Sequence, residues 1–594
     1  MTEAMDPGTP DDREDRYRRL IDTGIALSTM RNHHQLLEKI LLEAKRFALA
    51  DGGTIYLTTE DGNALRFEIM RNDTLGIALG GTTGAAIPYP PIPLFGEDGQ
   101  PNHRNISSSA ALSGTTIAIT DAYDVERFDF SGTRAFDART GYRSRSFLTV
   151  PLKNHNGEVV GVIQLINART GDGTVIPFPD EIVPLIEALA SQAAVALDNQ
   201  MLIEAQKKLF RSLIQMIAGA IDAKSPYTGG HCRRVPELAA MLARAAHEAR
   251  DGPLASFTLT EDEWYELSVA SGLHDCGKVT TPEYVVDKAT KLETLYNRIH
   301  EIRTRFEVVK RDAEIDYLRA VLAGGNPETL AAARDARLRQ FDDDFAFVAT
   351  CNIGSEFMDP ERIERLKRIA GITWLRTLDD TLGLSEEETV RKGGAGDKAV
   401  PPVVEPLLAD RPEHRIPHHK PPLAPDNPWG FTIKQPPLEF NLGELYNLSV
   451  RAGTLTAEER YHINDHMVQT IIMLEALPFP STLKRVPEWA GGHHEKMDGT
   501  GYPKGLARDQ MSIPARLLAV ADIFEALTAR DRPYKKRKTV SEAIAIMANM
   551  VRNHHIDPDL FALFVTAGVY RQYAEAFLLP DQLDEVDIAA YLKP

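Results

Sequence analysis

Residues 516–529 read RLLAVADIFEALTA, a run that predicts a helix with apolar side chains on nearly every side. Asp522 interrupts this helix, and SGLHDCGK at residues 271–278 places Asp275 in apolar surroundings at the end of another predicted helix. A carboxylate that is buried without a partner pays a high desolvation cost or takes up a proton. No Arg or Lys lies one turn from Asp522 on its own helix, so we expect a cation to face these carboxylates.

Histidines stand in the same kind of setting at the ends or in the middle of predicted helices. They are His231, His274, His466, His493 and His494. Adjacent ligands, as at 274–275 and 493–494, suit metal binding because surrounding partners hold the rings in place. One buried histidine is usually a satisfied core residue. Five histidines and two aspartates at such places favour a metal site within a helical domain.

The composition limits the classes of function. The chain has 594 residues, of which 43% are hydrophobic and 26% charged, as in soluble globular proteins of several domains. A net charge of −18 disfavours binding to nucleic-acid polymers and anionic membranes. The three cysteines form no CxxC pair, and no apolar signal peptide or membrane-spanning run is present. We therefore expect a cytoplasmic protein without membrane insertion.

The N-terminal part predicts an α+β module at residues 15–200, after a disordered lead at residues 1–14. Helical spacing over residues 17–50 is followed by short β-like runs at 52–59, 64–70, 114–120, 146–152 and 157–168. The segment SFLTVPLKNHNGEVVGVIQLIN at residues 146–167 predicts a hairpin with its turn at 154–157. A helix with apolar positions from Ile182 to Leu197 closes the module.

A connecting helix is expected at residues 192–212, and helical patterns then continue to the C-terminus with one exception. The segment at about residues 390–440 is rich in Pro and is expected to form neither helix nor sheet, but an irregular insertion over a helical domain. It contains His414, His418 and His419, for which exposed side chains are a better interpretation than metal ligands.

Two motifs resemble those that give the HD-GYP phosphodiesterases their name, HDCGK at residues 274–278 and HHEKMDGTGYPKGL at 493–506. Flanking blocks are also similar to this family, among them YTGGHCRRV at 227–235 and HIDPDLF at 555–561. The likeness covers about 203–302 and 451–566. It implies an all-α, HD-type, metal-dependent phosphohydrolase domain at residues 203–580. The implied reaction is hydrolysis of cyclic di-GMP to linear pGpG, with further hydrolysis to GMP left open.

The resemblance also implies a ligand set for two divalent metal ions. The first ion would take His231, His274, Asp275 and Asp522; the second would take His466, His493 and His494, with Asp275 bridging. Ligands that are all N and O, without thiolate, suit ions such as Fe and Mn, which we expect here. Such an ion pair would activate water and hold the phosphodiester for in-line attack.

The resemblance further implies roles in catalysis and substrate binding. Lys278 would join Asp275 as a catalytic residue and neutralise charge on the phosphoryl oxygens, although a solvated helix end is the alternative. Substrate contacts are expected from Gly501, Tyr502 and Pro503, whose turn permits close approach, and from Arg532 and Lys535, which would pair with phosphate unless they only cap a helix.

The sequence departs from the family pattern in two places. Members with three metals carry a carboxylate one turn before the first histidine, where this chain has Tyr227, so two metals are expected. The third histidine is separated from Asp275 by a long insertion, taken as residues 303–453. His466 follows Leu455-Thr456 at the spacing at which the helix of the family carries its histidine ligand. His300, in contrast, lies in a charged stretch. We therefore predict that His466 is the ligand.

The order of helix, sheet and helix in the N-terminal module resembles a GAF sensor domain. Asn167, Phe178, Asp180 and Glu181 are partly similar to the signature of nucleotide-binding GAF domains, but Ala168 replaces its Lys. A GAF domain without nucleotide is the preferred reading, with another small ligand left open. A homodimer through the 192–212 helix is expected. Two alternative functions stay open: phosphohydrolysis of another cyclic dinucleotide, and a catalytically silent receptor for one.

Overall fold

The computed structural model describes residues 10–30, 32–224, 230–354, 357–393, 400–419, 421–529 and 537–591. The chain forms two compact units, Met1–Phe210 and Arg211–Pro594. The first is an α+β domain and the second is largely helical. Throughout the described ranges, each helix is too short or too polar to cross a membrane.

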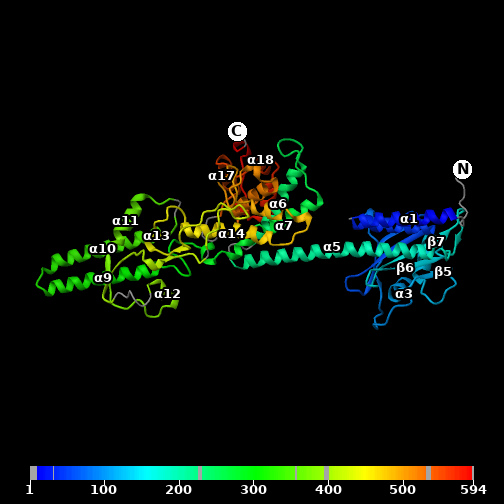
Figure 1. The fold of residues 1–594 in the computed structure, drawn as a ribbon, viewed down its shortest axis with the longest axis horizontal. Coiled ribbons are helices and arrows are strands. Elements are labelled where there is room, and N and C mark those ends of the chain that lie inside the picture. The colour runs from blue at the N-terminus through cyan, green and yellow to red at the C-terminus, as the bar shows by residue number, and fades with distance from the viewer. Residues whose placement is uncertain are drawn as a thin grey trace. The chain divides into compact units, whose positions relative to one another are not determined.

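The N-terminal unit is built on one antiparallel sheet (Figure 1). Its strands are β1 Ala50–Thr58, β2 Ala64–Asn72, β3 Ile77–Gly80, β4 Ile92–Pro93, β5 Ile117–Ile119, β6 Phe147–Lys153, β7 Val159–Arg169 and β8 Val175–Ile176. The strand order is β3-β2-β1-β7-β6-β5, with β4 on β2 and β8 on β7. Its helices are α1 Pro10–Thr29, α2 His33–Ala48, α3 Ile106–Ser113, α4 Ser131–Thr140 and α5 Val183–Lys224.

The sheet separates two apolar layers. Ile55 of β1 packs in the cluster formed with α2 and α5, whereas Tyr56, one residue later, points to the other face. This alternation is the two-residue period of a strand. β6 and β7 form the predicted hairpin, and Asn154 closes its turn by accepting a hydrogen bond from Gly157 N at 3.0 Å.

The N-terminal boundary differs from the prediction. α1 begins at Pro10, so the predicted disordered lead at residues 1–14 is helical from residue 10, and residues 1–9 lie outside the described ranges. α2 is a separate helix, because Asn32 caps its start by accepting a hydrogen bond from Gln35 N at 3.1 Å. α5 extends beyond the predicted connector at both ends.

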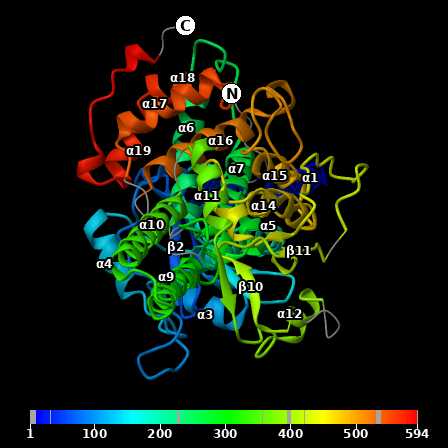
Figure 2. The same ribbon diagram turned by 90° about the vertical axis from the view of Figure 1, so that its left-hand side faces the viewer.

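The C-terminal unit is centred on α6, which contacts α7, α16, α18 and α19 (Figure 2). The elements of this core are α6 His231–Glu248, α7 Glu261–Leu273, η2 Cys276–Thr280, α8 Glu283–Val286, α14 Ala457–Glu475, η5 Ser481–Leu483, α15 Val486–Gly491, η6 Arg508–Gln510, α16 Ile513–Thr528, α17 Val540–Arg552, α18 Pro558–Thr566, α19 Val569–Phe577, η7 Pro580–Gln582 and η8 Ile588–Ala590. The buried residues of α6 include Val235, Leu238, Leu242 and Ala246, which recur at helical spacing.

Between α8 and α14 the chain makes a long excursion with its own apolar core, to which α9, α10 and α11 contribute. Its elements are α9 Ile299–Leu322, α10 Pro327–Asn352, α11 Pro360–Ala370, β9 Thr373–Arg376, α12 Glu386–Arg391, β10 Val403–Pro406, η4 Pro412–His414, β11 Arg415–Ile416, β12 Phe440–Asn441 and α13 Glu444–Leu448. α9 and α10 lie side by side as a helical hairpin (Figures 1 and 2).

The expectation that residues 390–440 form no sheet is wrong. β10 pairs with β9, and β11 pairs with β12, each as a two-stranded antiparallel ladder. Val403 and Val404 are β-branched and favour a strand, and a ladder of only two strands leaves one edge of each strand unpaired, where Pro is tolerated. The Pro content therefore shortens the strands without preventing them.

The two ends of the excursion lie next to each other. Lys291 is fully buried, and its Nζ donates hydrogen bonds to Leu448 O at 3.1 Å and Val450 O at 2.7 Å. Lys288 forms a buried ion pair with Glu459 at 2.7 Å, near the start of α14. The predicted first residue of the insertion, 303, falls inside α9. The chain thus leaves the helical core and returns to it at one place.

Candidate metal centre

His231 is the first residue of α6. Gly230 precedes it with φ of +90°, a conformation that favours glycine, and its N–H donates to Asp222 Oδ2 at 3.1 Å. His274 follows the end of α7, and Asp275 starts η2. The start of α6, the end of α7 and the start of η2 therefore bring three of the predicted ligands together.

Gly277 allows η2 to lie directly against α14, the helix that carries His466. A Cβ at residue 277 would sit 1.9 Å from the carbonyl oxygen of His466, and the Gly277 N–H donates to Thr470 Oγ1 at 2.9 Å. The glycine of the HDCGK motif is therefore required for this close approach. His493 and His494 follow α15, and Asp522 lies within α16.

The side chains form two groups that can each hold a metal ion. One group is His231, His274, Asp275 and Asp522, and the other is His466, His493 and His494; within each group the ligand atoms lie within 4.8 Å of one another. Oδ2 of Asp275 lies 3.1 Å from His231 Nε2 and 3.2 Å from His274 Nε2. Oδ1 of the same carboxylate lies 3.3 Å from His466 Nε2 and 3.9 Å from His493 Nε2.

Hydrogen bonds fix the tautomer of three histidines. The Nδ1 atoms of His274, His466 and His493 lie against the backbone oxygens of Ser271, Ile463 and Ala490. A carbonyl oxygen can only accept, so each Nδ1 carries the hydrogen and each Nε2 of a neutral ring presents a lone pair. These lone pairs converge on a carboxylate, which is also an acceptor.

This convergence is unfavourable unless a cation lies between the groups. Nε2 of His274, His466 and His493 and Oδ1 of Asp275 are buried, and none has a hydrogen-bond partner within the described ranges. Buried polar atoms are rarely left in this state. The donor set therefore fits divalent metal ions, through nitrogen and oxygen ligands alone.

The electrostatics agree with this fit. Burial would raise the pKa of Asp275, but Lys278 and His274 hold that pKa well below its usual range. Burial, together with His274, lowers the pKa of His493 to about 4, and burial with the neighbouring His493 lowers the pKa of His494 well below its ordinary value. The Asp275 carboxylate is thus anionic and these two rings are neutral, the states that bind metal.

Comparisons with known proteins were made for both units. A family model described as a GAF domain matches residues 32–197, and a family model described as an HD domain matches residues 402–560. The chain combines a GAF domain with an HD domain. The second match includes His466, His493, His494 and Asp522, while the ligands before the excursion precede it.

Curated relatives of the HD domain are phosphodiesterases. A cyclic di-GMP phosphodiesterase of Pseudomonas aeruginosa is 53% identical over 79 residues, 13% of this chain and 18% of that protein. The 3′3′-cGAMP-specific phosphodiesterase 3 of Vibrio cholerae is 36% identical over 136 residues, 23% of this chain and 27% of that protein. The chain thus spans about a fifth to a quarter of these relatives' lengths. A crystal structure of the Acinetobacter phosphoenolpyruvate-protein phosphotransferase GAF domain matches 33% of this chain and 99% of that chain, at 14% identity and a TM-score of 0.24.

Lys278 lies beside the carboxylate of Asp275. Its Nζ is 2.5 Å from Asp275 Oδ2, the oxygen that also faces His231 and His274. Burial would lower the pKa of Lys278, but Asp275 and Asp522 raise it, so the side chain is charged. Its position permits contact with an anion bound at the first group.

Glu495 supports the loop at residues 501–503, hereafter the GYP loop, and the backbone that follows it. This buried carboxylate accepts hydrogen bonds from Lys504 N at 2.7 Å and Leu506 N at 2.9 Å. Gly501 is required, because a Cβ there would lie 2.4 Å from Glu495 Cα. The ring of Tyr502 stacks on His494, with centroids 4.9 Å apart and planes at 14°. One face of Tyr502 is therefore already occupied by a predicted ligand.

Other residues singled out from the sequence lie elsewhere. Arg532, Lys535 and Tyr227 fall outside the described residues. His300 is exposed, and its Nδ1 accepts a hydrogen bond from Arg303 at 2.8 Å. In the excursion, His418 bonds to Pro436 O and Gln435 and His414 bonds to Arg411 N, so neither belongs to the two ligand groups.

Glu525, which was not predicted from the sequence, also contributes to the site. This residue is buried one turn after Asp522. Its carboxylate accepts a hydrogen bond from Nδ1 of His231 and forms an ion pair with Arg234 at 2.6 Å. It orients the ring of His231, as backbone carbonyls orient the rings of His274, His466 and His493. A second carboxylate in the apolar run RLLAVADIFEALTA was the signal that could have revealed it.

The GAF domain has a pocket lined by the sheet, by α4 and by the loop before β4, through side chains that include Tyr56, Phe67, Phe136 and Tyr89. Asn167, which is similar to the first residue of the nucleotide-binding signature, uses its amide within the protein. Its oxygen accepts from Arg145 N, and its nitrogen donates to Tyr142 Oη and Arg143 O. This amide holds strand β7 in place.

Proposed function

We propose that the HD domain hydrolyses cyclic di-GMP to linear pGpG with two divalent metal ions, Fe or Mn, and that the GAF domain regulates this reaction. The observation that carries the proposal is the carboxylate of Asp275. One of its oxygens faces His231 and His274, and the other faces His466 and His493. A single residue is thus placed to serve two ions.

The first ion would be held by His231, His274, Asp275 and Asp522, and the second by His466, His493, His494 and Asp275. When bound, such a pair supplies Lewis-acid stabilisation and activates water for in-line displacement at phosphorus. Hydrolysis breaks one P–O bond of the ring, and water supplies OH to phosphorus and a proton to the released ribose oxygen. Lys278 is placed to stabilise the charge that develops on the phosphoryl oxygens.

The proposal is tested with the full chain purified without oxygen and loaded with Mn²⁺ or Fe²⁺. Chromatography of the products should show pGpG forming from cyclic di-GMP, with GMP appearing later if the second bond is also cleaved. Asp275→Ala should give neither product. A wild-type chain that holds two ions and leaves cyclic di-GMP intact would point to another substrate or to a receptor.

The relatives favour a second substrate as well, because one of them is specific for 3′3′-cGAMP. Both molecules share the cyclic bis-phosphodiester ring, so the metal groups serve either one. A panel of both substrates at equal concentrations, compared by kcat/KM, decides between them.

For the remaining partners, we propose that a small molecule occupies the GAF pocket and that the chain forms a cytoplasmic homodimer. The dimer is supported by exposed apolar residues on α5 at seven-residue spacing, Val195, Leu202, Leu209 and Met216. This is the spacing of a coiled-coil seam. Light scattering of the full chain and of Leu209→Glu tests the dimer, and a monomeric wild type would refute it.

A further inference from the structure

Within the excursion between α8 and α14, residues 424–435, which we call the return loop, pack against the HD core. Phe431 is buried in a cluster with Val468 and Ile471 of α14. Asn427 closes the loop, since its side chain accepts from Phe431 N at 2.9 Å and donates to Phe431 O at 3.0 Å. The return loop is therefore a defined structure seated on the helix that carries His466.

The return loop contacts the GYP loop directly. The N–H of Thr432 donates to the carbonyl oxygen of Pro503 at 2.8 Å. Nζ of Lys504, the next residue, lies 5.9 Å from the centre of the Phe431 ring, within the range of a cation–π contact. The excursion thus fixes the backbone that immediately follows Tyr502.

His494 depends on this arrangement. The rings of His231, His274, His466 and His493 are each held by a hydrogen bond at Nδ1. Over the described part of the chain, the ring of His494 has no such bond. It contacts the rings of His466 and His493 and stacks on the ring of Tyr502. The backbone N–H of Tyr502 also donates to His494 O at 3.2 Å.

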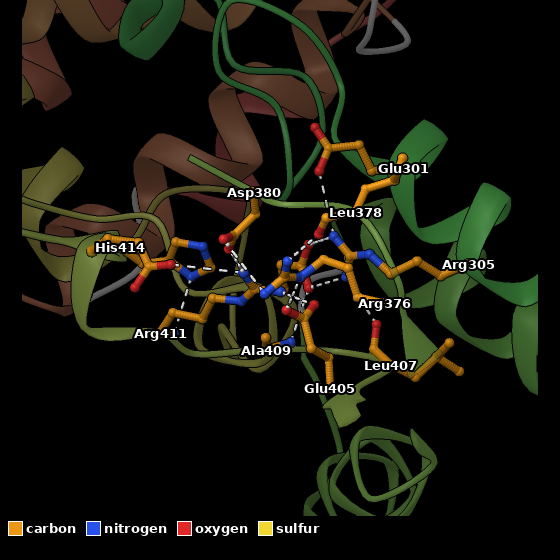
Figure 3. A network of polar contacts seen from close by, with 12 residues as sticks. Glu301, Arg305, Arg376, Leu378, Asp380, Glu405, Leu407, Ala409, Arg411 and His414 are labelled. Carbon is orange, nitrogen blue, oxygen red and sulfur yellow. Dashed lines mark hydrogen bonds and ion pairs between the residues drawn. The ribbon is translucent and has the colours of Figure 1, made fainter. Parts of the chain in front are cut away.

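Ion pairs between Arg and carboxylate side chains hold the elements of the excursion together. Figure 3 shows Arg305, Arg376 and Arg411 among the carboxylates of Glu301, Asp380 and Glu405. Arg305 also forms a two-pronged ion pair with Glu444 of α13, at 2.8 Å for each contact. Bidentate pairs of this kind fix geometry as well as charge. They join α9, β9, β10 and α13.

The excursion makes a second contact with α14. The ring of Phe440, in β12, stacks on His462 of α14, with centroids 4.4 Å apart and planes at 12°. His462 Nε2 also bonds to Glu439 O at 3.1 Å. The excursion therefore holds α14 one turn before His466 as well as beyond it.

We propose that the excursion is a positioning element of the second metal group. It acts through Thr432 on Pro503, and through Tyr502 on the ring of His494. The inference rests on the proposed metal-dependent function, because it concerns the ligands of that site. In its absence, the His494 ring would sample orientations in which its nitrogen does not face the second ion.

The test removes both hydrogen bonds that Thr432 donates to Pro503 O, from its N–H at 2.8 Å and from its hydroxyl at 3.4 Å. Thr432→Pro lacks the N–H, whereas Thr432→Val keeps it and loses only the hydroxyl. Mn²⁺ binding to the full chain is followed by electron paramagnetic resonance of the free ion. We expect the affinity for one of two Mn²⁺ ions to fall about 10-fold or more in Thr432→Pro, as when a supporting contact of a metal ligand is lost. The other ion should bind as in wild type, and Thr432→Val should stay near wild type.

Hydrogen exchange supplies a readout that requires neither metal nor turnover. The amides of Tyr502, Lys504 and Leu506 should exchange faster in Thr432→Pro. Lys310→Ala is the matched control, because it breaks only an exposed ion pair with Asp342, within the α9–α10 hairpin. If Thr432→Pro fails to fold, Phe431→Leu takes its place in the test. This variant keeps an apolar contact with α14 but removes the aromatic ring that Lys504 contacts. It should show the same effects at a smaller size.

The outcomes separate this inference from the proposed activity. A folded Thr432→Pro chain with two Mn²⁺ ions at wild-type affinity and unchanged exchange would overturn the inference. A wild-type chain that binds two Mn²⁺ ions but hydrolyses no cyclic dinucleotide would overturn the activity, while the loss of one ion in Thr432→Pro would still support the positioning role.

Discussion

His466 Nε2 lies 3.3 Å from Oδ1 of Asp275, although the entire excursion separates the two residues along the chain. We therefore predict that His466→Ala loses about one metal ion per chain and most activity, because the second group loses a ligand that is held in place by Ile463 O. His300→Ala should keep both ions, since that side chain is exposed and bonded to Arg303. Metal analysis of the two variants checks this, and the reverse pattern would refute the assignment.

Replacing Asp275 with Ala should abolish turnover and lower the content of both ions. Each oxygen of this carboxylate faces a different group of histidines, so one substitution affects both sites. Metal content and product formation are measured on the same preparation. Two ions per chain with near-normal turnover would show that Asp275 is not a bridge.

Lys278→Ala should retain both ions and reduce kcat, by about 10²–10³-fold if the ammonium stabilises the transition state as a typical charged or hydrogen-bonding partner does. The charge is present throughout the usual assay range, because neighbouring carboxylates raise the pKa of Lys278. Steady-state kinetics distinguish the alternatives. A change confined to KM would place Lys278 in uniform substrate binding.

Glu525→Gln should weaken binding of the first ion about 10–100-fold, the usual effect of losing a partner that orients a metal-bound histidine. The carboxylate is buried against Nδ1 of His231 and Arg234, and the amide removes its charge. Binding of the second ion should not change. Glu542→Gln, at an exposed helix start, is the control, and equal affinities in both variants would argue against a role for Glu525.

Lys291 predicts an unusual dependence of stability on pH. Burial lowers its pKa from 10.5 to about 8, so between these values the unfolded chain binds more protons than the folded chain. The free energy of unfolding should therefore rise with pH from 8 to 10.5, by about 3 kcal/mol at most. Lys291→Met should lack this rise. Denaturant titrations of both proteins measure it, and parallel pH curves would contradict the prediction.

Local patterns in the sequence were sufficient for part of the fold. The β6–β7 hairpin follows from alternating apolar residues around Asn154–Gly157, and the buried face of α6 follows from helical spacing. The pairing of β1 with β7 joins distant segments, and no local pattern specifies it. The β9–β10 ladder was missed because Pro content dominates the local signal, whereas pairing with a distant strand decides the outcome.

The candidate metal centre, like the fold, could be predicted from the sequence only in part. His and Asp in apolar helices indicated ligands, because burial of such groups needs a cation. The supporting residues were harder to predict. Gly277 matters through its distance to His466 O, and Glu495 matters through the amides of Lys504 and Leu506, and both are relations in space. The contact of Thr432 with Pro503 depends on where a long excursion returns.

The adjacent ends of that excursion have a consequence for how the chain can be altered. Because Lys291 reaches Leu448 O and Val450 O, the core bridges only a short gap where the excursion begins and ends. The entropy cost of closing a loop grows slowly with its length. A helical core of this kind can exchange the module at that junction if the replacement also covers the surface of α14 that Phe431 and Phe440 contact. The junction is therefore a natural cut site for chimeras that transplant the module between related chains.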